Sequence, residues 1–336
     1  MNPNDVIAQT TSSSIDFDGA GKQLGHLGLA AETDHSAWGT VQIPLCVISH
    51  GQGPTVALLS GLHGDATVGT AALHRLINEL EPHSIQGTLI IIPTINTTAQ
   101  AIGQRFSPLD NKNLNRCFPG DPQGTFSDRL AHLITEQIIS RSDIVVDVHS
   151  GGSSMEFTPL AAVHFRADKV EQKRAEELMI AFGAPNSLRL LEVSDRGMLD
   201  SVVEEANKIF VTTELGGGGT ATSTQIRSCL IGCRNVLVQS GLLQQELALR
   251  MSRMLEIRNT DGYLVAPRSG LLDMHAELGS DVYRGDPIAQ IINPEQVGTA
   301  TTPILATFNG VLIARHYPGR VSQGDCIAVL ADEVQR

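Results

Sequence analysis

No stretch of this 336-residue chain stays apolar for the ~20 residues that a membrane-spanning helix requires. The first 21 residues are polar and contain no apolar segment of the length found in signal peptides. We therefore expect a cytoplasmic protein that has no membrane partner.

Cysteine is scarce. The five cysteines are an odd number and are scattered along the chain. Cys229 and Cys233 are four residues apart within a predicted helix, which is not the spacing of a zinc knuckle. We therefore expect buried thiols in a reducing cytoplasm rather than a disulfide framework.

Basic residues are too few to balance the acidic ones. Lys plus Arg number 24 and Asp plus Glu number 36, so the net charge is −12 at pH 7. A chain with a negative net charge is a poor candidate for binding nucleic acid or anionic membranes. Hydrophobic residues make up 41% of the chain, enough for the core of one large domain and a smaller one.

The segment 55–80 carries the first chemical signature. Its apolar run at 55–60 predicts a buried strand, and the apolar residues that follow at four- and five-residue spacing predict a helix. His63 and Asp65 lie on the turn between them, at the carboxyl end of the strand, where open α/β sheets build their sites. Taken alone, the turn is more typical of a helix cap than of a metal site.

Two later strands end in the same way. The runs 143–148 and 208–213 predict strands that lead into His149 and Glu214, and glycines follow both. Parallel strands bring their carboxyl ends to one edge of a sheet, so we expect these groups to converge with His63. Two imidazoles and a carboxylate are typical ligands of a catalytic Zn²⁺. An unligated carboxylate such as Glu214 can take a proton from zinc-bound water.

A long irregular segment from 96 to 124 adds basic groups. Arg116 supplies a guanidinium that can hold a carboxylate through two hydrogen bonds, and Arg105 is a second candidate. A loop of this length is usually functional, although an ordinary surface loop is the alternative. Asp147 either orients His149 or is a simple buried hydrogen-bond partner.

Strands alternate with helices up to residue 257. This order predicts an α/β domain with a mostly parallel sheet and helices on both faces. Residues 1–21 are expected to be a flexible or loosely docked lead-in. The other expected elements are strands at 40–49, 88–92 and 187–193, and helices at 126–138, 169–182, 222–239 and 241–256.

Residues 258–336 consist of short β-like runs divided by Gly, Pro and Asp. The runs repeat, which predicts a small C-terminal β-barrel or sandwich of two similar halves, resembling biotinyl or lipoyl carriers. Such carriers need a lysine, and none follows Lys208, so we expect a structural role without an attached cofactor. The matching segments are Gly270–Leu272 with Gly310–Leu312, and Gly285–Ala289 with Gly324–Ala328.

Four motifs occur together in the order seen in succinylglutamate desuccinylases and aspartoacylases. The chain resembles that family of zinc amidohydrolases over nearly its whole length. Its closest resemblance is to the N-α-acetyl-L-2,4-diaminobutyrate deacetylases of ectoine degradation, through Ser36–Gly39 and the glycines after Glu214. The four motifs are His63–Asp65, Asn113–Gly120, Asp147–Gly152 and Thr213–Gly219.

The resemblance implies a zinc-carboxypeptidase-like fold that holds one Zn²⁺ ion. The implied reaction is hydrolysis of the amide of a small N-acyl amino acid, most closely N-α-acetyl-L-2,4-diaminobutyrate. Assembly as a homo-oligomer is left open. The implied roles are zinc binding for His63 and His149, catalysis for Glu214, and substrate binding for Asn115, Arg116 and Arg105.

One position departs from the family motif His-Gly-x-Glu, whose glutamate is a zinc ligand. This chain has Ala66 there, which is expected to weaken zinc binding. Three explanations stay open: an engineered inactive variant, a natural member in which Asp65 or water replaces the carboxylate, or a loss of zinc chemistry. The last would leave a ligand-binding or regulatory protein on the same scaffold, whereas Glu214 and Arg116 favour an enzyme.

Overall fold

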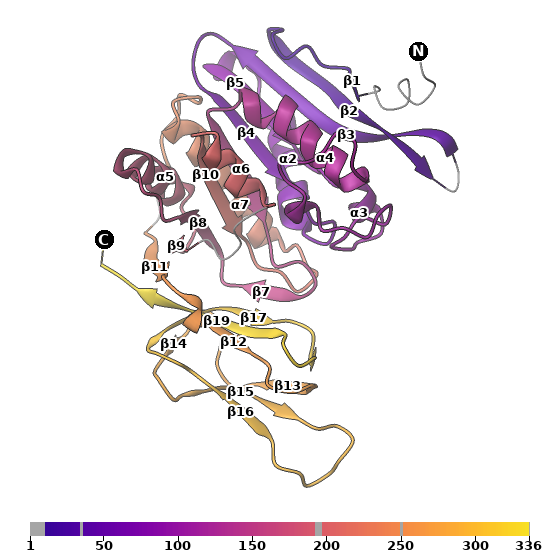
Figure 1. Ribbon diagram of the computed structural model, residues 1–336. Helices are drawn as coiled ribbons and strands as arrows, with labels where there is room; N and C mark the ends of the chain where they lie inside the picture. Colours follow the sequence, from indigo (N-terminus) through magenta and orange to yellow (C-terminus); the bar gives the residue numbers. More distant parts are fainter. Residues whose placement is uncertain (1–10, 34–35, 192–196, 249–250, 336) are drawn as a thin grey trace.

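The computed structural model describes residues 11–33, 36–191, 197–248 and 251–335. Figure 1 shows an α/β part, in which helices flank a large sheet, and a C-terminal part made of strands. Within the described residues, no helix is long and apolar enough to cross a membrane.

One sheet runs through the α/β part in the order β1-β2-β3-β5-β4-β6-β10-β8-β9-β11. β5, β4, β6 and β10 are parallel neighbours, and β8, β9 and β11 form a second parallel group. The prediction of a mostly parallel sheet is therefore confirmed. The strands are β1 (Thr11–Ser13), β2 (Gly21–Thr33), β3 (Ser36–His50), β4 (Thr55–Ser60), β5 (Gly87–Ile92), β6 (Ile144–His149), β8 (Leu160–His164), β9 (Asn186–Leu190), β10 (Ile209–Glu214) and β11 (Arg253–Ile257).

Helices cover both faces of this sheet, as predicted (Figure 1). Successive strand residues point to opposite faces, so Val56 packs into one buried cluster with α2, α5 and α7, and Ala57 into another with α4 and α6. Both faces of the central strands are therefore buried. The helices are α2 (Thr67–Glu79), α3 (Thr97–Ala101), α4 (Phe126–Gln137), α5 (Lys169–Phe182), α6 (Leu199–Glu205) and α7 (Ser223–Gln239), and the 3₁₀ turns are η1 (Pro82–Ser84), η2 (Leu114–Arg116), η3 (Ile139–Arg141) and η4 (Thr260–Gly262).

The predicted helix at 241–256 is wrong. The described residues 241–248 are not helical, and β11 runs parallel to β9 from Arg253 onward. Met254 and Leu255 are buried there. The leucine spacing suggested a helix locally, but pairing of β11 with β9 and β19 satisfies the backbone hydrogen bonds and buries Met254 and Leu255.

The start of the chain also differs from the expected lead-in. Thr11–Ser13 forms β1 on the edge of the β2–β3 hairpin, so part of this segment is ordered in the sheet. Residues 1–10 of the lead-in lie outside the described residues, as does the end of the strand expected at 187–193. The sequence analysis also missed β2, β8 and α6.

The C-terminal part consists of two antiparallel sheets over one buried cluster. Each repeat pairs one of its strands with a strand of the other repeat. Gly270 of β13 lies opposite Val321 of β18, and Gly310 of β17 lies opposite Val282 of β14. The duplication is therefore visible in the strand pairing, and a closed barrel is not confirmed. The remaining strands are β7 (Met155–Phe157), β12 (Tyr263–Val265), β13 (Gly270–Met274), β14 (Asp281–Val282), β15 (Pro287–Ile292), β16 (Thr302–Leu305), β17 (Gly310–His316), β18 (Arg320–Val321) and β19 (Cys326–Glu333).

Strands that follow the predicted boundary at residue 258 pair with strands that precede it, and this pairing joins the two parts. β19 pairs with β11, and β17 pairs with β7. The C-terminal strands therefore extend the large sheet and reach the carboxyl end of β6 through the β7 segment.

Candidate active site

Three neighbouring strands bring the main candidate side chains to one edge of the sheet. β6 lies between β4 and β10, and His149 is in register with Glu214. His63 follows β4 after a turn at Gly61, whose φ of +69° and close approach to Thr94 exclude a side chain. His63, His149 and Glu214 therefore converge, as their positions at three strand ends predicted.

The two imidazoles face each other through defined nitrogens. Nδ1 of His63 lies 3.1 Å from Nε2 of His149. Nε2 of His63 lies 3.0 Å from Oδ1 of Asn113, an oxygen that also accepts the backbone N–H of Asn115. Nδ1 of His149 lies 2.7 Å from Oδ2 of Asp147. Both outer nitrogens therefore donate to oxygens, which leaves lone pairs on the two inner nitrogens. A shared proton, a bound cation or the guanidinium of Arg105, which lies 3.3 Å from Nδ1 of His63, can satisfy them.

The surroundings shift the pKa values of the two imidazoles in opposite directions. Burial and the nearby cations His149 and Arg105 hold the pKa of His63 well below its usual value. Burial also acts to lower the pKa of His149, but the attraction of Asp147 outweighs it and raises the pKa to about 8. The opposite directions of these two pKa shifts favour His149 over His63 as the ring that carries the shared proton.

The carboxyl group of Glu214 has a pKa close to neutral pH. Burial raises the pKa of Glu214 to about 7, although His149 and Arg105 act in the opposite direction. Its Oε2 atom is buried and has no hydrogen-bond partner among the described residues. A carboxyl group with this pKa can both accept and donate a proton near pH 7.

The loop that follows β5 brings two guanidinium groups to the same place. NH1 of Arg105 lies 3.3 Å from Nδ1 of His63, whereas Arg116 is exposed and its NH1 donates to the backbone oxygen of Asn115. Oδ1 of Asn115 accepts the backbone N–H of Leu199 at 2.9 Å. Asn115 therefore fixes the loop to the start of α6, in addition to the substrate-binding role predicted for it.

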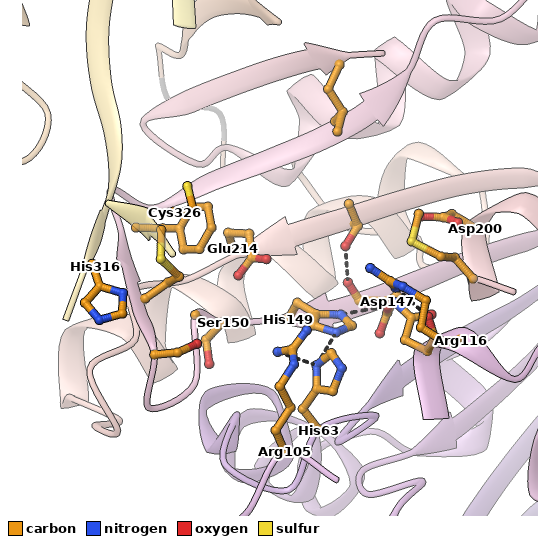
Figure 2. Close-up of a pocket in the computed structure, with 18 of the residues that line it drawn as sticks. His63, Arg105, Arg116, Asp147, His149, Ser150, Asp200, Glu214, His316 and Cys326 are labelled. Atoms are coloured by element: carbon orange, nitrogen blue, oxygen red, sulfur yellow. Dashed lines mark hydrogen bonds and ion pairs between the residues drawn. The ribbon is translucent and has the colours of Figure 1, made fainter. Parts of the chain in front are cut away.

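These groups line one cavity of about 570 Å³. Figure 2 shows His63, His149, Asp147 and Arg105 close together, with Asp200 and Arg116 on one side of them and His316 and Cys326 on the other. The C-terminal part contributes His316, Asp325 and Cys326 to the lining. The C-terminal part therefore forms part of the cavity wall.

Ala66 and Asp65 do not complete a metal site with the two histidines. Ala66 is buried at the N-cap of α2 and has no donor atom. Oδ2 of Asp65 accepts the backbone N–H and the hydroxyl of Ser153, each at 2.8 Å. Among the described residues, no group of three or more His, Cys, Asp or Glu is placed to hold a metal ion. The facing lone pairs fit two positions of a cation, and the third protein ligand that zinc enzymes use is missing.

Sequence reasoning missed several residues of the site. Asn113 was quoted only as part of a motif, and its position two residues before Asn115 gave no sign that it reaches His63. Asp200 and His164 come from α6 and β8, two elements that were not predicted. The lining residues from the C-terminal part follow from strand pairing between distant segments, which no local pattern signals.

Comparison with known proteins identifies the family. A model of the succinylglutamate desuccinylase/aspartoacylase catalytic domain matches residues 52–239. The chain is also 40% identical over 326 residues to the N-alpha-acetyl-L-2,4-diaminobutyric acid deacetylase of Halomonas elongata, which covers 96% of this chain and 95% of that protein. The chain belongs to the succinylglutamate desuccinylase/aspartoacylase family.

Solved structures of this family share the whole fold. A succinylglutamate desuccinylase from Silicibacter sp. and the product-bound ectoine utilization protein EutE (DoeB) from Ruegeria pomeroyi each match with a TM-score of 0.93 and 40% identity. Both matches cover 96% of this chain and 98% of the other. The resemblance drawn from the four motifs is therefore confirmed, including its closeness to the diaminobutyrate deacetylases of the family.

Proposed function

We propose that this family member hydrolyses the amide bond of a small N-acyl amino acid, and that its substrate is N-α-acetyl-L-2,4-diaminobutyrate. The observation that carries the proposal is the convergence of His63, His149 and Glu214 in one cavity with two arginines. The deacetylase of Halomonas elongata, 40% identical over nearly the full length, supports the acetyl group and the diaminobutyrate part.

The basic loop binds the substrate in this proposal. The exposed guanidinium of Arg116 can form two parallel hydrogen bonds with the α-carboxylate. Arg105 is partly buried and lies beside His63, where its N–H groups can stabilise the negative charge that develops on the acyl oxygen. Asn115 holds the loop against α6 and so keeps Arg116 in place.

Glu214 moves the protons of the reaction. Hydrolysis adds a water oxygen to the acyl carbon, breaks the C–N bond and releases acetate and the free amine. Glu214, with a pKa of about 7, takes the proton of the attacking water and gives it to the leaving nitrogen. Glu214 is the last residue of β10 and is in register with His149, so its buried carboxyl group lies beside the two imidazoles.

His63 and His149 would hold one zinc ion through Nδ1 and Nε2, the two nitrogens that face each other. The chemistry that zinc would supply there is a lowering of the pKa of water to ~7 and polarisation of the acyl carbonyl. With Ala66 at the third position, we propose that this ion is bound weakly.

Ala66 also supports a second candidate function, a ligand-binding or regulatory protein whose metal site has decayed. The two candidates differ in one measurement: acetate release from N-α-acetyl-L-2,4-diaminobutyrate, with and without added zinc. Turnover that disappears in Glu214→Gln supports the hydrolase. Binding of the substrate without acetate release, at saturating zinc, would support the binding protein instead.

A further inference from the structure

Four carboxylates line the cavity, and the proposed reaction uses only two of them. Asp147 is hydrogen-bonded to His149, and Glu214 lies at the reacting group. The other two are Asp325, from the C-terminal part, and Asp200, from α6.

Asp325 has a structural explanation in the repeat. Its Oδ2 accepts the backbone N–H of Ser322 at 2.7 Å, and Asp286 accepts the N–H of Tyr283 in the same way at 2.9 Å in the other copy. Asp286 is not a lining residue of the cavity. The carboxylate at this position therefore belongs to the turn that both halves of the duplicated unit share.

Asp200 has a different setting. It lies in the first turn of α6 and is only 9% exposed, and its Oδ1 accepts the backbone N–H of Ser201 at 2.6 Å. Its Oδ2 lies 3.8 Å from Nε2 of His164, another lining residue. The carboxylate is thus oriented by its own helix while it forms part of the cavity wall.

The position of Asp200 is tied to that of Arg116. The residue before it, Leu199, donates its N–H to Oδ1 of Asn115, the neighbour of Arg116. A second tie is the bond from the N–H of Phe118 to the backbone oxygen of Gly197. Figure 2 shows Asp200 and Arg116 on the same side of the cavity. One negative and one positive side chain of the same cavity wall are therefore carried by two segments that are bonded to each other.

We infer that Asp200 binds the side-chain ammonium of the substrate while Arg116 binds its α-carboxylate. The inference rests on the proposed function for its substrate, since 2,4-diaminobutyrate carries both charges on one short chain. A buried carboxylate stabilises a cation of this kind and disfavours a neutral or acidic side chain. Asp200 is thus the residue that selects cationic N-acyl amino acids.

Binding of the two product-like amino acids tests the inference without requiring turnover. Calorimetry would compare L-2,4-diaminobutyrate with L-2-aminobutyrate, which has the same carbon chain and α-ammonium group but no side-chain ammonium group. We expect the full-length protein to bind diaminobutyrate at least ~30-fold more tightly, and Asp200→Asn to lose this preference. Asparagine keeps an acceptor for the N–H of Ser201, so the variant should fold.

Two variants serve for comparison. Asp286→Asn, away from the cavity, and Asp325→Asn, in its wall, should both keep the preference for diaminobutyrate. Equal binding of the two amino acids by the unaltered protein, no binding of either, or loss of the preference in Asp325→Asn instead of Asp200→Asn would each overturn the inference. Acetate release is measured in parallel: its absence, with the binding preference intact, would overturn the proposed hydrolase and leave the role of Asp200 standing.

Discussion

Nδ1 of His63 and Nε2 of His149 lie 3.1 Å apart, and the outer nitrogen of each ring is directed to an oxygen of Asn113 or Asp147. These oxygens fix which nitrogen of each ring carries the hydrogen. The two inner lone pairs then repel each other unless a positive charge offsets them, and the guanidinium of Arg105 lies 3.3 Å from Nδ1 of His63. The two inner nitrogens can also serve as two ligands of a cation, although residue 66 offers no third ligand.

The first prediction is that Ala66→Glu raises zinc affinity. The new carboxylate would lie three residues after His63, at the start of α2, on the same side of the turn as the imidazole. We expect at least a ~10-fold gain in affinity, since even residues that only orient a ligand are worth about 10–100-fold. Competition with a chelator gives the affinity, and elemental analysis gives the stoichiometry.

Ala66→Gln is the matched control for this experiment. Glutamine has the same length as glutamate and a much weaker metal-binding group, so it separates coordination from repacking around the buried residue 66. If the unaltered chain already retains stoichiometric zinc against the chelator, another group supplies the third ligand, and our account of position 66 is wrong.

A second prediction concerns Asn113, whose Oδ1 accepts from His63 and from the N–H of Asn115. Asn113→Ala should free the His63 ring to rotate and to change tautomer, with a loss of roughly 10–100-fold in zinc affinity and in kcat/KM. Nitrogen NMR of the imidazoles reports the tautomer directly. Lys112→Ala, next in the same loop and bonded to Asp128, should leave the tautomer unchanged.

Much of the fold followed from the sequence because its central strands are buried on both faces. Val56 and Ala57 are both inaccessible, so the run at 55–60 is continuously apolar and is recognisable without knowledge of its partners. β3 was predicted at 40–49, where its apolar half is buried, whereas β2 has no comparable buried run in its first half and was missed. The segment at 241–256 was misassigned because its leucines suit a helix, while pairing with β9 decides the outcome.

The site was predictable where one strand end carries one reactive group. His63, His149 and Glu214 each follow an apolar run, so topology alone brought them together. Asn113 and Asp200 were not predictable, because their positions depend on how a loop and a short helix fold over the strand ends. The hydrogen bond between Asn115 and Leu199 joins residues 84 apart in sequence, and no local pattern signals it.

A third prediction is that Arg116→Lys weakens substrate binding without unfolding the protein. Lysine keeps the charge and loses the planar pair of donors that matches a carboxylate. We expect KM to rise roughly 10-fold, with a smaller change in kcat and an almost unchanged melting temperature, because Arg116 is exposed. Arg129→Lys, outside the cavity lining, is the control. Steady-state kinetics that match the unaltered protein would place Arg116 outside the binding site.

A fourth prediction uses the repeat of the C-terminal part. Asp286 and Asp325 accept equivalent backbone N–H groups from Tyr283 and Ser322, so alanine at either position should cost a similar ~1 kcal/mol of unfolding free energy. Neither loss should change the preference for diaminobutyrate, although only Asp325 lines the cavity. Denaturant titrations check the first statement. A large difference in stability between the two variants would show that the halves are not energetically equivalent.

The last prediction is that Glu214 makes the metal-free protein less stable as pH rises. Its pKa of about 7 lies above the ordinary value of 4.5, so the folded state holds a proton that the unfolded state has released between these pH values. The contribution of Glu214 to the unfolding free energy therefore falls as pH rises from 4.5 to 7. His149, raised from 6.5 to about 8, contributes a further fall up to that pH, whereas His63, whose pKa is lowered, contributes a rise below pH 6.5. In denaturant titrations with a chelator, the Glu214 contribution is therefore the difference between the unaltered protein and Glu214→Gln, and this difference should fall from pH 4.5 to 7. Glu136→Gln, at an exposed position on α4, should leave the slope unchanged.

The same ionisation of Glu214 should make kcat/KM rise through pH 7, because only the carboxylate form accepts a proton. A slope that persists unchanged in Glu214→Gln would mean that Glu214 is already ionised well below pH 7, and that another group accepts the proton near neutrality.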